Sequence, residues 1–305
     1  MQCLRMFSGS ILIVIASVSC NQSAMSQSGV TAIYDTPPFK EYWYAGKAEL
    51  NAYNLEQSRY GESRSGKAML IFVTEPFSAS KQVKLDNPEQ AGSDKVTVMK
   101  LNYTKNFVTG IYPYSMMLSA FTPVSRNQYP NTLKVTMTSQ EWCGHVFAQM
   151  NLDGRKYDVA SYSYFEQEGD VKFSTDKVLL EDELFNLIRI DPEHLPLGNV
   201  KILPGLFFTR LKHENLKPLE AKLSKNTSET STTYQIEFPN RLLTIHVGKE
   251  FPYKILGWEE EFNEGENKML TKATLDKTLV TDYWRKNKNE YLPLRDSLGL
   301  SPNNY

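Results

Sequence analysis

The stretch Gln140-Glu141-Trp142-Cys143-Gly144-His145-Val146-Phe147-Ala148-Gln149-Met150 lies near the middle of the 305-residue chain and predicts its fold class. We interpret it as one β-strand, in which side chains alternate between two faces. Val146, Ala148 and Met150 then share an apolar face, and the opposite face is mixed. Segments of similar character lie on both sides of this stretch, so we take it as the reference strand of one sheet.

The mixed face of the reference strand carries the candidate catalytic residues Glu141, Cys143 and His145. A thiol, an imidazole and a carboxylate could serve a hydrolase as nucleophile, base and orienting acid, with His246 as an alternative base. Same-face neighbours on a strand stand about 6.5 to 7 Å apart, so the thiol reaches His145 only if the intervening glycine forms a bulge. The competing interpretation, which we favour, buries Cys143 as a small hydrophobe, places Trp142 in the core and hydrogen-bonds His145 within the sheet.

The segments around the reference strand predict a mainly β protein. The pair Asp153-Gly154 favours a tight hairpin turn, and no crossover helix separates the strands, so the sheet should be antiparallel. We expect a curved antiparallel sheet or half-barrel of about ten to twelve strands with two or three helices packed on its concave side. Besides the reference strand, the predicted strands are 42–53, 67–77, 96–107, 111–121, 133–140, 156–165, 219–223, 232–238, 242–247, 254–262 and 269–283.

Three helices are predicted, at 178–189, 204–213 and 287–298. In the first, leucines recur at helical spacing, Asp176 is the expected cap, and Pro192 follows the end. The apolar faces of these helices need a surface to cover, and the sheet provides it. No internal repeat and no long linker divides the body of the chain, so we predict a single domain over residues 31–305.

Residues 1–20 have the features of a signal peptide. Arg5 supplies a positive charge, and the apolar run that follows is too short to span a bilayer. The run ends at Val18-Ser19-Cys20, which resembles the bacterial lipobox, whose cysteine is lipid-modified and becomes the new N-terminus. Ser17 departs from the lipobox pattern, where Leu, Val or Ile is typical, so ordinary secretion with cleavage elsewhere stays open. Residues 21–30 are expected to be a flexible tether.

Composition and motifs exclude several classes of function. The formal net charge is −1, so no basic surplus indicates a nucleic-acid partner. Glycine-rich phosphate loops, nucleophile elbows and His-Glu-x-x-His helices are absent from the sequence. Cys3 leaves with the signal peptide and Cys20 would be acylated, so Cys143 alone can form neither an intramolecular disulfide nor a multi-cysteine zinc site. We therefore expect no cofactor and no metal.

Four phrases of the chain, taken together, resemble an uncharacterised family of bacterial envelope lipoproteins of about this length. The similarity covers most of the mature chain and implies an envelope location, without implying an activity. The phrases are Tyr42-Trp43-Tyr44-Ala45-Gly46-Lys47-Ala48-Glu49-Leu50, Tyr112-Pro113-Tyr114-Ser115-Met116-Met117, Gln140-Glu141-Trp142-Cys143-Gly144-His145 and Phe251-Pro252-Tyr253-Lys254-Ile255-Leu256-Gly257-Trp258-Glu259.

Some members of that family carry the label "septum formation inhibitor Maf". Maf proteins are nucleotide pyrophosphatases with a Ser-x-Ser-Pro-Arg-Arg motif after the first strand, and nothing in this sequence matches that motif. The label therefore gives no reason to expect nucleotide hydrolysis here.

Two functions are compatible with these observations. The first is a non-catalytic binding, carrier or structural module, attached by its lipid to the bacterial cell envelope and taking a lipid, a glycan or an envelope protein as ligand. The second is a hydrolase that uses Cys143 and His145. We favour the first, and expect it at the outer membrane, on its periplasmic or its surface side.

Overall fold

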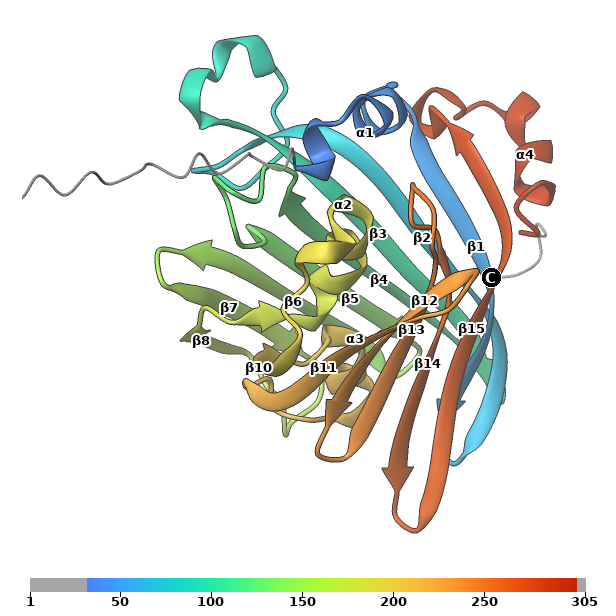
Figure 1. The fold of residues 1–305 in the computed structure, drawn as a ribbon. Coiled ribbons are helices and arrows are strands. Elements are labelled where there is room, and N and C mark those ends of the chain that lie inside the picture. Colours follow the sequence, from blue (N-terminus) through green and yellow to red (C-terminus); the bar gives the residue numbers. More distant parts are fainter. Residues whose placement is uncertain (1–31, 301–305) are drawn as a thin grey trace, which may run out of the picture. The chain divides into compact units, whose positions relative to one another are not determined.

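The structure is a computed structural model, and it describes residues 32–300. The expected signal peptide (1–20) and tether (21–30) lie outside the described residues, together with Cys3 and Cys20. Within the described range the strands form one 15-stranded sheet (Figure 1). The strands are β1 (Ala48–Arg59), β2 (Glu62–Ser78), β3 (Lys95–Thr109), β4 (Tyr112–Pro123), β5 (Lys134–Glu141), β6 (Gly144–Asp153), β7 (Lys156–Ser163), β8 (Val171–Asp176), β9 (Leu179–Leu180), β10 (Gly198–Leu203), β11 (Leu219–Thr227), β12 (Ser231–Phe238), β13 (Arg241–Gly248), β14 (Ile255–Glu264) and β15 (Asn267–Thr281).

The first and last strands of the sheet pair with each other in its middle. From β1 the sheet continues strand by strand to β8 on one side, and from β15 it continues in reverse order to β9 on the other. Every pair is antiparallel except β9 with β10, which is parallel. Among the described residues β8 and β9 are the two edges, so the sheet stays open.

The predicted fold class is confirmed in its coarse features and wrong in the number of strands. The sheet has 15 strands instead of ten to twelve, because β8, β9 and β10 were not predicted. Strand β8 is exposed at all but one position, so it has no apolar alternation that marks a strand. Strand β9 has only two residues, and β10 is buried only at its last two positions, Ile202 and Leu203.

The prediction of a strand over 42–53 is wrong in its first part. Helix α1 covers Pro37–Trp43, and β1 begins only at Ala48. Two prolines occupy the first turn of α1, where a missing N–H group costs nothing. Phe39 and Trp43 are spaced one helical turn apart, and both are buried. The period of the apolar residues here is therefore that of a helix.

The predicted helix over 178–189 is divided into three elements. Leu179 and Leu180 form β9, a 3₁₀ turn follows at Glu181–Glu183, and helix α2 covers Leu184–Ile190. Asp176 is not its cap, since it ends β8. Instead, the carboxylate of Glu183 accepts the backbone N–H of Leu180 at 3.0 Å.

The other two predicted helices are confirmed in position and are shorter than expected. Helix α3 covers Leu206–Lys212, and helix α4 covers Pro293–Asp296, preceded by a 3₁₀ turn. Within residues 32–300, no helix has the length and apolar character needed to cross a membrane. The predicted hairpin at Asp153-Gly154 is confirmed: Gly154 has φ +56°, a conformation that favours glycine, and Asp153 pairs with Lys156.

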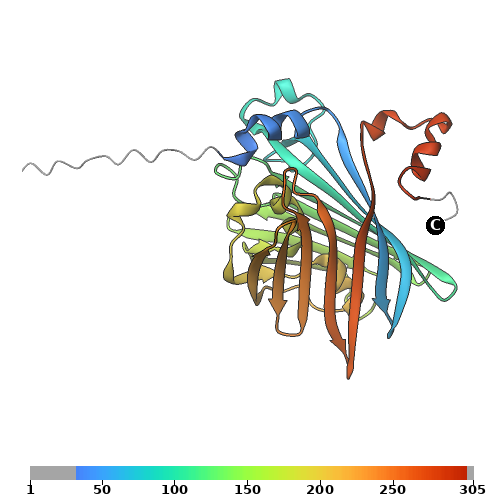
Figure 2. The same ribbon diagram turned by 45° about the vertical axis from the view of Figure 1, so that its right-hand side comes forward.

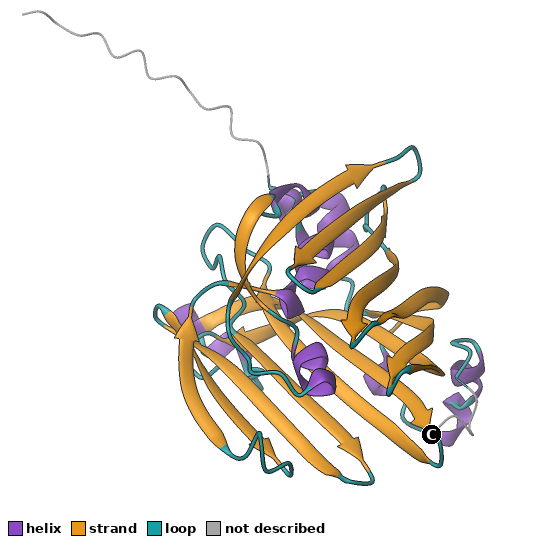
Figure 3. Cartoon of the chain, turned by 90° about the horizontal axis from the view of Figure 1, so that it is seen from below, coloured by secondary structure: helices purple, strands orange, loops and turns teal. Residues whose placement is uncertain are grey.

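Helices α2 and α3 fill the concave side of the sheet (Figure 3). Helix α2 lies over β3 and β4, and α3 lies over β4 and β5. Beneath them, Tyr103 of β3 meets Trp258 of β14, from the other half of the sheet, with 5.3 Å between ring centroids. The ring of Tyr103 also lies 4.8 Å from that of Phe207 on α3. Asn186 fixes α2 to the sheet by donating to the carbonyls of Met99 and Ala120 at 3.1 and 3.3 Å.

A buried ion pair also joins α2 to β1. Arg189 donates to both carboxylate oxygens of Glu49 at 2.7 and 2.8 Å, and both side chains are fully buried. Tyr42 donates to the same carboxylate, and Asn51 donates to it at 2.7 Å. Burial alone would raise the pKa of Glu49, but Arg189 and these hydrogen bonds lower it to about 2.

The hairpin turns divide between the two ends of the sheet. The turns that join β1 to β2, β12 to β13 and β14 to β15 lie at one end, and α1 lies at the other (Figures 1 and 2). The antiparallel registers also bring the turns between β3 and β4 and between β5 and β6 to the first of these ends. We call it the turn end.

Candidate binding site

The reference stretch is not a single strand. Strand β5 ends at Glu141 and β6 begins at Gly144, with Trp142 and Cys143 as a two-residue turn between them. The backbone N–H of Cys143 donates to the carboxylate of Glu141 at 2.6 Å and stabilises the turn. Gly144 is required because the ring of Tyr164 lies 2.6 Å from the place where a Cβ would stand.

This turn places two of the candidate catalytic residues, Cys143 and His145, at the surface, whereas Glu141 is buried. Cys143 is exposed, and Trp142, predicted in the core, is 70% exposed. The prediction of a buried Cys143 and a core Trp142 is therefore wrong, because the turn carries both out of the sheet. A hydrogen bond that the Cys143 thiol donates to the carboxylate of Glu141 raises the pKa of the thiol, the opposite of what a nucleophilic thiolate needs.

The two candidate bases do not complete a catalytic group with this thiol. His145 is exposed at the start of β6, opposite Gln140. His246 lies on β13, with seven strands between it and β6 in the sheet, and its ring is 3.4 Å from the hydroxyl of Thr233. Within residues 32–300 no group of three His, Cys, Asp or Glu side chains could hold a metal ion.

The concave centre of the sheet has almost no free space. A cavity of about 40 Å³ lies between the helices and the sheet, enough for one or two water molecules. It is bordered by charged side chains, including Lys105 and Asp182. Burial lowers the pKa of Lys105, and burial together with the charge of Glu181 raises the pKa of Asp182 to about 8. The interior is thus a packed core with a small polar centre.

A larger pocket, of about 550 Å³, lies at the turn end, and we take it as the candidate binding site. It is formed by one side of α3, the segment that follows α3, and the ends of β12, β13 and β14. The residues that line it are Pro204, Phe208, Lys212, Glu214, Asn215, Lys217, Leu219, Phe238, Pro239, Asn240, Arg241, Phe262 and Asn263.

The inner wall of the pocket is aromatic. Phe208 of α3 meets Phe262 of β14 edge to face, with 5.7 Å between ring centroids. The guanidinium of Arg241 lies 4.1 Å from the ring centre of Phe208 and 4.2 Å from that of Phe238. Cation–π contacts of this kind hold the rings around one central cation.

The charge of Arg241 is compensated by two carboxylates behind the wall. Its guanidinium pairs with Glu181, and with Glu260 at 2.6 Å. All three residues are buried. Arg241 is therefore a structural group that holds the wall of the pocket in place. Its charge is already paired with Glu181 and Glu260, without a ligand.

The mouth of the pocket is polar and exposed. Asn215, Asn240 and Asn263 present amide groups, and Lys217 has no ion-pair partner among residues 32–300. Lys212 is already paired with Glu264 at 2.9 Å. The site therefore combines an apolar wall with hydrogen-bonding groups at its entrance, a common composition for small-molecule sites.

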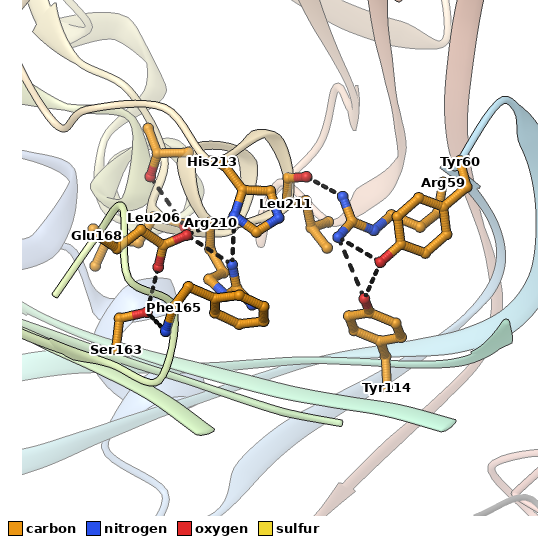
Figure 4. A network of polar contacts seen from close by, with 11 residues as sticks. Arg59, Tyr60, Tyr114, Ser163, Phe165, Glu168, Leu206, Arg210, Leu211 and His213 are labelled. Carbon is orange, nitrogen blue, oxygen red and sulfur yellow. Dashed lines mark hydrogen bonds and ion pairs between the residues drawn. The ribbon is translucent and has the colours of Figure 1, made fainter. Parts of the chain in front are cut away.

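Helix α3, which carries part of the wall, is fixed on its other side by a polar network (Figure 4). At the end of β1, the guanidinium of Arg59 donates to the carbonyl of Leu211 and, at 3.3 Å, to the hydroxyl of Tyr114. The same guanidinium stacks 4.1 Å from the ring centre of Tyr60. One end of α3 is thus tied to two strands in the middle of the sheet.

The loop between β7 and β8 holds the same end of α3. Glu168 accepts from Arg210 at 3.0 Å and lies 2.6 Å from the Nδ1 atom of His213 (Figure 4). Its other oxygen accepts from the hydroxyl of Ser163 at 2.6 Å. A helix of seven residues has little stability of its own. These contacts therefore set the position of Phe208 and Lys212 at the pocket.

Comparisons with known proteins give a distant structural similarity and no family. No protein-family model matches the chain, and no curated protein is significantly similar to it. A crystal structure described as a β-barrel-like protein of domain of unknown function DUF1849, from Brucella abortus, is similar with a TM-score of 0.46. The similarity covers 77% of this chain and 98% of that one at 7% sequence identity, and it assigns no activity here.

Proposed function

We propose that this chain is a non-catalytic binding or carrier module of the bacterial cell envelope, attached by lipid at Cys20. The pocket at the turn end would hold an amphiphilic small molecule. The observation that carries this proposal is a pocket of about 550 Å³ with an aromatic wall and a polar mouth. The lipobox-like sequence ending at Cys20 supports the attachment.

The chemistry of the lining defines the ligand class. An apolar portion would lie against Phe208, Phe238 and Phe262, where burial of hydrocarbon is favourable. A head group with hydroxyl, amide or anionic oxygens would meet the asparagines and Lys217 at the mouth. A lipid or a lipid-linked glycan has both parts. The hydrolase alternative receives no support from the geometry around Cys143, and we do not propose it.

The test is to identify what the pocket holds. We expect an amphiphile to co-purify with the full chain from its own membranes, detected by mass spectrometry in near-stoichiometric amount. Asn263→Phe should reduce the bound amount about tenfold, because a ring at this exposed position occupies the pocket.

The matched control is Asn267→Phe, at the start of β15 and outside the lining of the pocket. It should retain the ligand. An equal amount of ligand on both variants would show that binding occurs elsewhere, and a wild-type chain free of any amphiphile would contradict the proposal.

A further inference from the structure

Four exposed side chains on adjacent turns form a cluster at the turn end, which we call the tip cluster. Ile111 is 82% exposed, Trp142 and Tyr164 are each 70% exposed, and Tyr60 is 54% exposed. They come from the turns between β1 and β2, β3 and β4, and β5 and β6, and from the segment after β7. Exposure of this degree for four large apolar or aromatic residues has no explanation in the packing of the core.

Contacts show that these turns are neighbours. The hydroxyl of Tyr60 lies 3.0 Å from that of Tyr114 on β4. Tyr112, beside Ile111, has its ring centroid 6.5 Å from that of Trp142. The ring of Tyr164 packs on Gly144, directly after the Trp142 turn. The tip cluster therefore lies on neighbouring segments of the turn end and not on distant parts of the sheet.

The position and composition of the tip cluster suit contact with a deformable apolar surface. Tyr60, Ile111 and Trp142 lie on two-residue hairpin turns and are exposed, whereas hot-spot residues of protein interfaces usually fill pockets. The turn residues Tyr60-Gly61, Gly110-Ile111 and Trp142-Cys143 include no charged side chain. Isoleucine is the most exposed member, and tryptophan and tyrosine, which suit the boundary between hydrocarbon and water, accompany it.

The binding pocket opens at the same end. Glu264, at the end of β14, accepts the backbone N–H of Gly61 at 3.1 Å and Lys212 at 2.9 Å. Gly61 belongs to the Tyr60 turn, and Lys212 lines the pocket. A surface that engaged the tip cluster would therefore lie beside the mouth of the pocket.

From these observations we infer that the tip cluster docks on a lipid bilayer, with Ile111 and Trp142 inserted at the level of the head groups and upper acyl chains. This inference goes beyond the proposed function, since it requires no ligand in the pocket. If the proposed function and this docking both hold, docking would bring the mouth of the pocket to the bilayer surface from which an amphiphile enters or leaves.

The test uses fluorescence quenching of tryptophan in vesicles. The full chain is incorporated in phosphatidylcholine vesicles whose acyl chains carry bromine, a contact quencher. In a second arm, the protein is incorporated in vesicles without bromine, and these are mixed with brominated vesicles that carry no protein. This arm detects contact with a bilayer other than the one that holds the lipid anchor. Trp43 and Trp258 are buried and Trp284 is 43% exposed, so Trp142 is the tryptophan most accessible to lipid.

We expect quenching in at least one arm, and its loss in Trp142→Phe. Ile111→Asp should weaken it about tenfold, because a charge replaces the most exposed apolar side chain. Leu197→Asp is the matched control, since Leu197 is 54% exposed outside the tip cluster, and it should leave quenching unchanged. Asn263→Phe should also leave it unchanged, which separates this inference from the pocket.

Equal quenching of wild type and Trp142→Phe in both arms would overturn the inference. So would an absence of quenching together with photo-crosslinking of the Trp142 position to an envelope protein, which would show that the cluster is a protein interface.

Discussion

At the scale of single residues, the turn at Trp142 and Cys143 changes the interpretation of the middle of the chain. Alternation was the right principle for Val146, Ala148 and Met150, which are buried as predicted. It failed at Trp142 because a two-residue turn interrupts the strand there, and the pair Trp-Cys carries none of the usual turn signals. The exposure of Trp142 follows from this local backbone geometry alone.

The first prediction concerns the stability contribution of these two residues. Trp142→Ala and Cys143→Ala should each change the free energy of unfolding by less than about 0.5 kcal/mol, since both side chains are exposed. Trp43→Ala should cost roughly 3 to 5 kcal/mol, because Trp43 is 2% exposed. Urea denaturation measures all three. A loss of several kcal/mol in Trp142→Ala would contradict its placement in the turn.

The second prediction concerns the ion pair between Glu49 and Arg189. Arg189→Met should destabilise the protein by about 3 to 5 kcal/mol, because it leaves a buried carboxylate unpaired. The double variant Glu49→Gln with Arg189→Met should recover most of this loss, since no buried charge remains. Thermal and chemical denaturation of the three variants provide the comparison. If the double variant were no better than Arg189→Met, lost packing would be the cause instead.

The same pair predicts a pH dependence at acid pH. The pKa of Glu49 is lowered to about 2 in the folded chain, below the ordinary value for glutamate. Its contribution is therefore fully present above about pH 4.5 and is lost as the pH falls toward 2, at no more than about 1.4 kcal/mol per pH unit. Denaturation midpoints between pH 5 and 2 should fall less steeply in Glu49→Gln than in the wild type.

At the scale of elements, the sequence predicted the strands and helices whose apolar residues recur at a regular spacing. It did not predict the elements that lack such a spacing. Strand β12 alternates cleanly, and β3 alternates except at Val98 and Met99, which are both buried. Both strands were placed to within two residues at each end. Helix α1 and strands β8 to β10 were missed because each is short or lacks an apolar face that alternates. The binding pocket was missed for another reason: Phe208, Phe238 and Phe262 lie at the ends of separate elements, and only the tertiary fold brings them together.

The 3₁₀ turn between β9 and α2 is the subject of the next prediction. Asp182 accepts the first backbone N–H of α3, from Leu206, at 3.1 Å, and its pKa is raised to about 8. A raised carboxyl pKa stabilises the fold below the unfolded pKa, near 4, and this stabilisation is lost as the pH rises through 8. Asp182→Asn keeps an acceptor for Leu206 and cannot ionise.

Relative to Asp182→Asn, the wild type should therefore lose up to about 1.4 kcal/mol of unfolding free energy per pH unit between pH 5 and 8. Urea denaturation at several pH values in this range measures the difference. Parallel pH profiles of the two proteins would show that Asp182 is ionised throughout.

At the scale of the whole molecule, composition and the first 20 residues predict location, and the sheet adds nothing to that argument. Cys20→Ser should release the protein from membranes into the soluble fraction, because acylation of this cysteine is the proposed attachment. Fractionation of cells that express each form, followed by immunoblotting, measures it. An unchanged membrane fraction would refute lipid attachment at Cys20, and binding of the tip cluster could then be tested by adding Ile111→Asp.

The pairing of β1 with β15 also bears on how the protein is made. Most strands pair with the strand next to them in sequence and can form hairpins as they emerge, but Ala48 meets Thr281, near the other end of the chain. During synthesis β1 therefore has one unpaired edge until β15 has been made. A chain that stops before β15 would keep that edge open, and we expect such products to aggregate or to be degraded.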